Sequence, residues 1–329
     1  MANQKDPGFA QALACFGGVI CIVILGLLWF GISLHVLLIM GIVWAGAHAI
    51  SLGFEFGSLK TAMSSGIEKG LGAIYIFFLI GLLIAALIES GTVASLIYYG
   101  VDLLHPGVFL PAGLILCSLM SLATGTAWGT IGTIGVVLMG LGGVLGIPLP
   151  LVAGMVVSGA SFGDKMSPVS DTTNLAAMSA EADLYAHIKS MLYTTVPTYV
   201  IALIAFTAVG FQYADQALSV QELVELKDQL SNQFSIGIIP LVPLLVLLVL
   251  ALRRVPAEPS MLASIVAAII IAVSLQDRYW VDVLNSLQGG YVSDTGVERI
   301  DELLTRGGIQ SMMWTMSLAL IALALGGSS

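Results

Sequence analysis

Ten apolar runs, each long enough to cross or enter a lipid bilayer, constrain this chain more than any other feature of its sequence. A helix needs about 20 residues to cross the roughly 30 Å of hydrocarbon in a bilayer. The runs cover residues 14–30, 34–50, 71–88, 108–122, 130–147, 149–162, 191–211, 236–252, 261–275 and 312–325. Only 9% of the 329 residues are charged, against about a quarter in a soluble domain. The sequence therefore predicts an all-α polytopic membrane protein with about ten transmembrane or re-entrant helical segments.

The distribution of lysine and arginine predicts the orientation of these runs, because cytoplasmic loops carry an excess of both residues. With a cytoplasmic N-terminus, the inner segments hold Lys5, Lys60, Lys69, Lys165, Lys189, Arg253 and Arg254. The other basic residues fall in two longer acidic connections, 212–235 and 276–308, where charge says less about orientation. We therefore expect a multi-pass membrane protein with its N-terminus on the cytoplasmic side. The net charge of -9 argues against a nucleic-acid partner.

A dense set of oxygen-bearing side chains between two apolar runs is the strongest functional signal. It consists of Asp164, Ser167, Ser170, Asp171, Thr172, Thr173 and Asn174. Gly163 and Pro168 disfavour a continuous helix there, and a broken helix frees backbone carbonyls as further ligands. Secondary transporters hold Na⁺ or protons at such breaks, and an all-oxygen set suits a hard cation. The simpler alternative is a cytoplasmic loop in which Asp171 and Thr172 only cap the next helix.

A second polar group, rich in threonine and glycine, covers residues 124–135. Its glycines at 125, 129 and 132 recur at a spacing typical of close helix packing in membranes. Alternatively, a discontinuous helix here places Thr124, Thr126 and Thr130 in the same cavity as the first group. The two interpretations are compatible, because close packing would bring these threonines toward residues 164–174.

Two further charged residues have both a structural and a functional interpretation. Glu89 ends an apolar run, where it is either a solvated helix terminus or, if deeper, a proton relay. Lys165 is either an internal counter-charge on the proton route or a lysine at the cytoplasmic rim. The pattern G-x-S-x-G at residues 159–163 matches a nucleophile elbow, but it lies in an apolar helical run and not at a strand-to-helix turn. No enzyme activity is therefore predicted.

At these same residues the sequence resembles the NhaC-type sodium/proton antiporter family. The similarity lies in GDKMSPVSDTTNLA at 163–176, with SGTV at 90–93, YYG at 98–100 and GTAWGT at 125–130 upstream. It covers at least residues 81–197. The resemblance implies a secondary transporter of the ion-transporter group in the bacterial cytoplasmic membrane. It also implies a structure built from inverted repeats, with discontinuous helices around a mid-membrane site. Glu89 departs from the family pattern, which has a small neutral residue at this position.

The resemblance also implies a domain organisation within a single membrane transport domain, 1–329. Residues 14–211 form a motif-bearing N-terminal repeat, 212–235 an amphipathic external connection, and 236–329 the start of a C-terminal repeat. Within the connection, Ser219 and Glu222 form a capping-box pattern before apolar residues at helical spacing, which predicts a helix on the membrane surface. The last run ends at Gly-Gly-Ser-Ser, so we expect an incomplete second repeat and a longer parent protein.

The resemblance and the oxygen set together predict exchange of Na⁺ for H⁺ by alternating access, without a cofactor. In this hypothesis Asp164 and Asp171 face a narrow cavity and bind either cation competitively, with Na⁺ also held by Thr172 and Asn174. The coordination is completed by Ser167, Ser170 and Thr173, with Thr126 and Thr130 opposite. One alternative is a sodium- or proton-coupled exchanger of small carboxylates such as malate or lactate. Another is a truncated membrane subunit that does not transport. A homodimer is left open.

Overall fold

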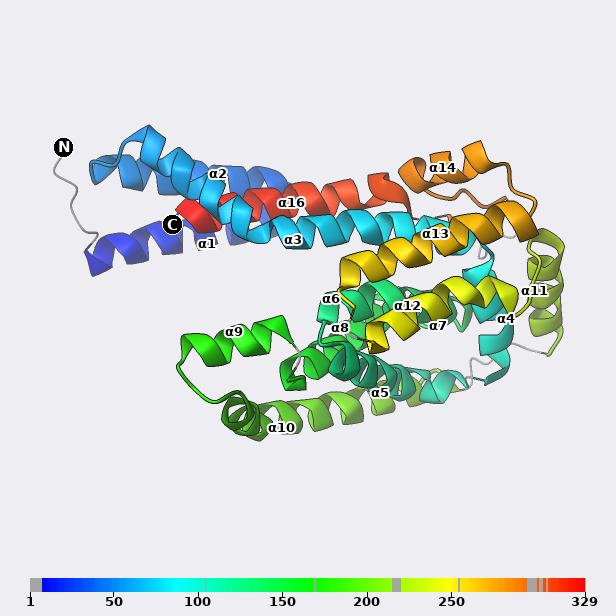
Figure 1. The fold of residues 1–329 in the computed structure, drawn as a ribbon. Helices are drawn as coiled ribbons and strands as arrows, with labels where there is room; N and C mark the ends of the chain where they lie inside the picture. The colour runs from blue at the N-terminus through cyan, green and yellow to red at the C-terminus, as the bar shows by residue number, and fades with distance from the viewer. Residues whose placement is uncertain are drawn as a thin grey trace. The chain divides into compact units, whose positions relative to one another are not determined.

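The computed structural model describes residues 8–328 except 104, 169, 215–219, 254, 295–300, 302–303 and 306. The described part of the chain is helical with short connections, and it contains no β-strand (Figure 1). Within it, seven helices are long and apolar enough to cross a membrane. They are α1 (Phe9–Leu28), α2 (Leu34–Ser51), α3 (Phe56–Glu89), α5 (Pro106–Thr124), α10 (Leu184–Phe211), α13 (Ala257–Leu275) and α16 (Gly308–Ser328). The predicted all-α polytopic membrane fold is confirmed.

Shorter helical elements complete the described chain. They are α4 (Thr92–Leu103), α6 (Ala127–Thr130), the π-helix η1 (Ile131–Gly135), α7 (Val136–Val144), α8 (Leu149–Met166), α9 (Asp171–Ser179), α11 (Val220–Gln233), the 3₁₀-helix η3 (Ile239–Leu241), α12 (Val242–Leu252) and α14 (Trp280–Gly289). Each of the ten apolar runs corresponds to a helix or to a series of helical elements. Helices α4, α9, α11 and α14 lie outside those runs.

The chain divides into two compact units, of which the first comprises residues 1–78 and 312–329. In this unit the indole of Trp44 on α2 packs at Gly18 on α1 and donates a hydrogen bond to the carbonyl of Cys15. Helices α3 and α16 approach through glycines, since a Cβ at Gly66 would lie 2.3 Å from the carbonyl oxygen of Leu323. Small residues of this kind allow close helix contact in membranes, where the surrounding lipid is as apolar as the helix surface.

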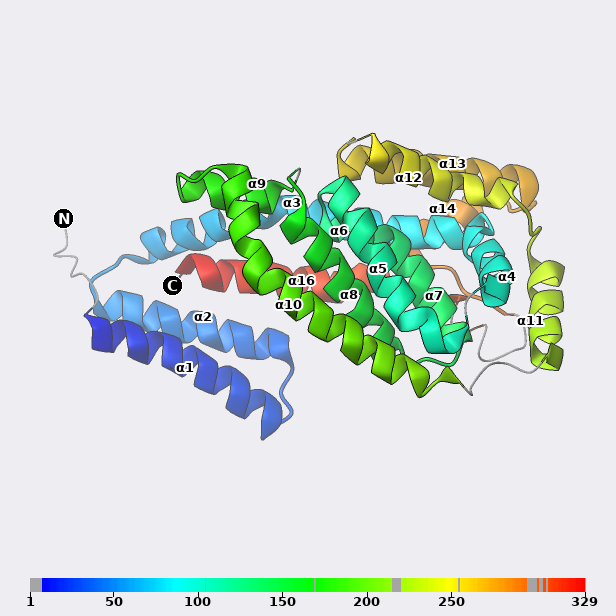
Figure 2. The same ribbon diagram turned by 90° about the horizontal axis from the view of Figure 1, so that it is seen from below.

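The second unit comprises residues 79–311, and α5, α7, α8 and α10 are neighbouring inclined helices within it (Figure 2). Helices α5 and α8 run in the same direction, because Gly159 lies against Leu114 and Gly163 lies against Leu122. The segment α6–η1–α7 returns in the opposite direction, with Gly142 of α7 against Val152 of α8. This topology brings the C-terminal ends of α5 and α8 to the same end of the unit.

Three details differ from the expectations. Helix α3 begins at Phe56 and not near residue 71, because its first turns carry polar residues that interrupt the apolar run without interrupting the helix. The expectation that Gly163 helps to break the helix is wrong, since α8 continues through it to Met166. The predicted amphipathic helix is present as α11, but Leu230 is only 1% exposed. Its apolar face therefore packs at least partly on protein and not on a membrane surface. Ser219 and the side chain of Glu222 lie outside the described residues.

Candidate functional site

Two interrupted helices end side by side in the second unit. Helix α5 ends at Thr124, and Gly125 follows with φ of +71°, a left-handed conformation that glycine adopts without strain. Thr126 then caps α6, its hydroxyl accepting a hydrogen bond from the amide of Gly129 at 3.2 Å. Helix α8 ends at Met166 and α9 begins at Asp171. The predicted discontinuity is thus found in both polar groups of the sequence.

The two ends are held together by backbone contact and by two hydrogen bonds. A Cβ on Gly163 would lie 2.3 Å from the carbonyl oxygen of Ser118, so only glycine fits there. The Ser121 hydroxyl donates to the carbonyl of Ala160 at 2.6 Å, and the Ser167 hydroxyl donates to the carbonyl of Leu122 at 2.8 Å. Ser167 therefore ties the α8 break to the last turn of α5 as a structural link between the two interrupted helices.

The carboxylate of Asp164 is the centre of the polar cluster at the α8 break. It accepts hydrogen bonds from the hydroxyls of Ser170 at 2.8 Å and Thr172 at 3.1 Å. These two hydroxyl oxygens lie 3.0 Å apart, so the two hydroxyl oxygens and the two carboxylate oxygens form a closed ring of contacts. Ser170 is fully buried, Asp164 is half-buried and Thr172 is exposed. The cluster is therefore reachable from one side.

Thr173 and Asn174 satisfy backbone carbonyls at the same break. The Thr173 hydroxyl donates to the carbonyls of Asp164 and Lys165, at 3.2 Å in each case. The Asn174 amide donates to the carbonyls of Pro168 at 2.9 Å and Ser170 at 2.8 Å. Both side chains replace hydrogen bonds that the interrupted helix has lost, so their visible role is to hold the break in shape.

The remaining predicted ion-binding residues are Asp171, Thr126 and Thr130, for which fewer contacts are described. Asp171 begins α9, but its side chain lies outside the described residues. At the start of α6, the Thr130 hydroxyl donates a hydrogen bond to the carbonyl of Thr126 at 3.0 Å. Both threonines belong to the α6 side of the junction, and Thr130 is buried. The described contacts do not join either of them to the carboxylate of Asp164.

Lys165 lines a groove between α8 and α10 and not the Asp164 cluster. The groove has a volume of about 480 Å³. Its polar lining consists of Ser158, Ser161, Lys165, Thr194, Thr195, Thr198 and Tyr199. The rings of Phe162 and Tyr199 stack in its wall with centroids 4.0 Å apart. Asp164 and Lys165, although adjacent in sequence, therefore serve different surfaces of α8.

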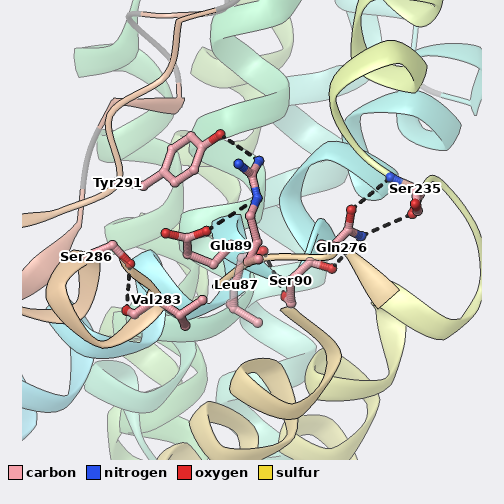
Figure 3. A network of polar contacts seen from close by, with 9 residues as sticks. Leu87, Glu89, Ser90, Ser235, Gln276, Val283, Ser286 and Tyr291 are labelled. Atoms are coloured by element: carbon pink, nitrogen blue, oxygen red, sulfur yellow. Dashed lines mark hydrogen bonds and ion pairs between the residues drawn. The ribbon is translucent and has the colours of Figure 1, made fainter. Parts of the chain in front are cut away.

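Glu89 lies in a second polar network, at the turn between α3 and α4 (Figure 3). Its side chain is 7% exposed, and its Oε2 lies 3.8 Å from Nε of Arg278. The interpretation of Glu89 as a solvated helix terminus is therefore wrong. Arg278 also donates a hydrogen bond to the Tyr291 hydroxyl at 3.2 Å. Burial raises the pKa of Tyr291 above its ordinary value near 10.

Gln276 joins two loops at the same turn (Figure 3). Its amide nitrogen donates to the carbonyls of Ser90 at 3.0 Å and Ser235 at 3.2 Å, while its oxygen accepts from the Ser235 amide at 2.8 Å. Arg278 and Gln276 were missed from the sequence, because each is a single polar residue far along the chain from its partner. The only local signal was Glu89 itself, an acid that needs a partner when buried.

The described residues contain no group of three or more histidine, cysteine, aspartate or glutamate side chains that could hold a metal ion. A cation at the Asp164 cluster would instead be bound by one carboxylate, hydroxyls and backbone carbonyls. That mixed oxygen set suits Na⁺, a hard cation of single charge, better than a transition metal.

Comparison with known proteins identifies the family of this chain. The Na⁺/H⁺ antiporter family model matches residues 9–173 and again residues 159–327. This chain belongs to the Na⁺/H⁺ antiporter family. It is 38% identical over 331 residues to the Na⁺/H⁺ antiporter NhaC of Alkalihalophilus pseudofirmus, covering 99% of this chain and 70% of that protein. The family confirms the resemblance seen at residues 163–176 and is one of transporters.

Other antiporters of this similarity carry different names. The chain is 37% identical to the malate-2H⁺/Na⁺-lactate antiporter of Bacillus subtilis, covering 99% of this chain and 70% of that protein. It is 33% identical to the arginine/ornithine antiporter ArcD of Halobacterium salinarum, covering 98% and 67% respectively. No solved structure matches the chain significantly. Membership of this antiporter family therefore does not by itself specify the cargo.

Proposed function

We propose that this protein exchanges Na⁺ for H⁺ across the bacterial cytoplasmic membrane by alternating access. The observation that carries the proposal is the carboxylate of Asp164 with the Ser170 and Thr172 hydroxyls, at a break between α8 and α9. Such breaks are where secondary transporters bind coupling ions. The 38% identity to an antiporter named for Na⁺ and H⁺ supports this choice of cargo.

The same four oxygen atoms, two of the carboxylate and two hydroxyls, can accommodate either cation. When Asp164 is protonated, its carboxyl group can donate a hydrogen bond to the Ser170 hydroxyl, which then acts as acceptor. When Asp164 is ionised, the hydroxyls of Ser170 and Thr172 can turn their lone pairs toward a bound Na⁺. One site thus holds Na⁺ or H⁺ but not both, and a site that changes sides only when occupied exchanges one cation for the other.

The other site residues take supporting roles in this proposal. Ser167, Thr173 and Asn174 hold the break, while Thr126 and Thr130 shape the neighbouring start of α6. Asp171 supplies the second carboxylate. In this proposal Glu89 and Lys165 are not part of the ion pathway. Glu89 is paired with Arg278, and Lys165 faces the α8–α10 groove.

The charges of the second unit favour one of its ends as the cytoplasmic side, while the cytoplasmic N-terminus stays a prediction from the sequence. Lys165, Lys189 and Arg253 lie where α8 ends, α10 begins and α12 leads into α13, at one end of this unit (Figure 1). Helices α11 and α14 lie at the opposite end. Because basic residues favour the cytoplasmic side, we place the Asp164 cluster toward the cytoplasm. The repeat boundaries at residues 211 and 236 and a homodimeric assembly also remain proposals.

The test is exchange in proteoliposomes that contain a pH-sensitive dye. Asp164→Asn should abolish Na⁺-dependent proton movement, because a side-chain amide neither gains nor loses a proton at physiological pH. Asp183→Asn is the matched control: Asp183 only caps α10 through the Ala186 amide, and asparagine caps equally well. In purified wild-type protein, the apparent affinity for Na⁺ should weaken as the pH falls, by up to about tenfold for each pH unit. Wild-type exchange by Asp164→Asn would refute the proposal.

A second candidate function is exchange of small carboxylates, which the α8–α10 groove favours. The groove presents one ammonium group, Lys165, among hydroxyls and beside an aromatic pair, a combination that can bind a carboxylate. Uptake of labelled malate or lactate by proteoliposomes tests it directly. Uptake that Lys165→Gln abolishes and Lys165→Arg retains would favour this function, whereas no uptake by the wild-type protein would exclude it for these substrates.

A further inference from the structure

The two helix breaks differ in how completely their polar groups are satisfied. At the α8–α9 break, Thr173 and Asn174 hydrogen-bond the exposed carbonyls, and the Asp164 carboxylate has two hydroxyl donors. At the α5–α6 break the corresponding groups are left open. The Thr124 hydroxyl oxygen is buried and has no hydrogen-bond partner among the described residues.

Backbone oxygens of the same turn are also open. Among the described hydrogen bonds, none reaches the carbonyl oxygens of Ala123 and Thr124, whereas the carbonyl of Ser121 accepts from the amide of Gly125. The left-handed Gly125 turns the chain away, so α6 does not continue the hydrogen bonding of α5. The C-terminal end of a helix carries partial negative charge, which favours a cation.

An unsatisfied buried hydroxyl is costly, and in a native protein it calls for an explanation such as an ion or water. One hydroxyl oxygen and two carbonyl oxygens of this turn have no hydrogen-bond partner among the residues that the structure describes. Such a set has the ligand chemistry of an alkali-metal site. Ala123 is exposed, so the turn can be reached from the end of the unit where it lies.

The turn is directly connected to the Asp164 cluster. The Ser167 hydroxyl, three residues beyond Asp164, donates to the carbonyl of Leu122, two residues before Thr124. Gly163, the residue before Asp164, packs against the amide of Leu122. A cation at this turn would therefore lie next to the segment that carries the exchanging carboxylate.

We propose that the Thr124 hydroxyl is a ligand of the transported Na⁺, at a site formed by the last turn of α5. The inference rests on the proposed Na⁺/H⁺ exchange and deepens it, because it assigns part of the cation site to α5. Asp164 then supplies the charge that Na⁺ and H⁺ compete for, and Thr124 supplies an oxygen that binds Na⁺ but does not titrate. The α5–α6 turn thereby contributes to selectivity for Na⁺ over H⁺.

The test compares Thr124→Val, which keeps the shape of the side chain and removes its oxygen, with Thr124→Ser, which keeps the hydroxyl. In proteoliposomes, Thr124→Val should raise the Na⁺ concentration for half-maximal exchange by about tenfold, equivalent to about 1.4 kcal/mol. Thr124→Ser should remain within about twofold of the wild type. Thr207→Val is the control for the substitution itself, because the Thr207 hydroxyl donates to Leu203 within α10 and its loss should leave Na⁺ dependence unchanged.

A second measurement separates a ligand from a structural residue. Thermal unfolding of the detergent-purified protein is followed with NaCl and with choline chloride. Without Na⁺, Thr124→Val should be at least as stable as the wild type, because it removes an unsatisfied buried hydroxyl. Its additional stabilisation by Na⁺ should be smaller than that of the wild type. If Thr124→Val does not fold, Thr124→Ala replaces it in both measurements.

The outcomes distinguish this inference from the proposed exchange itself. Wild-type Na⁺ dependence in Thr124→Val, together with loss of exchange in Asp164→Asn, would overturn the role of Thr124 and leave the exchange intact. Full exchange by Asp164→Asn would overturn the proposed mechanism. A Na⁺-dependent stabilisation that disappears in Thr124→Val would, even then, support Thr124 as a cation ligand.

Discussion

The contact between α5 and α8 makes Gly163→Ala the most informative structural perturbation. The added Cβ would lie 2.3 Å from the Ser118 carbonyl oxygen and 2.6 Å from the Leu122 amide nitrogen, both backbone atoms that cannot rotate away. Ordinary contact begins near 3.4 Å, so the helices must separate by about 1 Å. That movement lengthens both interhelical hydrogen bonds, from Ser121 to Ala160 and from Ser167 to Leu122.

The expected destabilisation follows from two unfavourable contributions and one favourable contribution. Overpacking of this kind costs about 1–3 kcal/mol, and each interhelical hydrogen bond in a membrane contributes about 0.6 kcal/mol. Alanine in a helix gains up to about 1 kcal/mol over glycine. The net loss is therefore about 2 kcal/mol. Gly154→Ala on the same helix is the matched control, because its Cβ would meet only Phe206, at 3.9 Å, and it should be neutral or stabilising.

Cys117 reports on this interface directly. It is buried on α5, and a Cβ on Gly159 of α8 would lie 2.8 Å from its Cβ. In a background with Cys15→Ala and Cys21→Ala it is the remaining cysteine of the three in the chain. Gly163→Ala should then raise its rate of labelling by a thiol reagent by roughly thirtyfold, the equivalent of about 2 kcal/mol. Equal melting temperatures and equal labelling rates in Gly163→Ala and Gly154→Ala would refute the argument from backbone contact.

Three further perturbations test the polar networks. Arg278→Gln leaves Glu89 buried without its counter-charge, so the free energy of unfolding in detergent should fall by about 1–3 kcal/mol. Adding Glu89→Gln should recover part of this loss. If the losses of the two single variants simply add in the double variant, the two residues are not a coupled pair. Tyr291→Phe should lessen the loss of stability at alkaline pH. Burial raises the pKa of Tyr291 in the folded protein. Its contribution to stability is therefore complete below the pKa of the unfolded state, near 10, and is lost as the pH rises through the pKa of the folded state. If the melting temperature of Tyr291→Phe falls at alkaline pH as steeply as that of the wild type, this prediction is wrong. Ser170→Ala removes the 2.8 Å hydrogen bond to Asp164 and should raise the Na⁺ concentration for half-maximal exchange by about tenfold. The control is Thr207→Val, since the Thr207 hydroxyl bonds within α10.

The helical breaks could be predicted because their causes are local. Pro168 cannot continue a helix and Gly125 adopts a left-handed conformation, and both effects are properties of single residues. The grouping of Ser170, Thr172 and Asp164 followed for the same reason, since all three lie within nine residues of sequence. Sequence alone could thus identify most of the cluster.

Contacts between distant parts of the chain could not be predicted in this way. Glu89 and Arg278 are 189 positions apart, and nothing local to either residue indicates the other. Gly163 was mistaken for a helix breaker because its intrinsic flexibility is visible in the sequence, whereas the α5 backbone that requires it is not. The start of α3 was missed because Lys60 and Glu68 interrupt the hydropathy pattern while leaving the helical backbone unaffected.

The backbone contact at Gly159 and Gly163 also limits how this transporter can move. Two helices that touch through backbone atoms at Gly159 and Gly163 cannot part without large cost, so we expect α5 and α8 to move as a single body during transport. The oxygen atoms at their ends would keep their mutual geometry while the walls around them rearranged. Access to either side of the membrane would then depend on segments that flank this body, and the left-handed glycines at 125 and 146 lie after α5 and before α8.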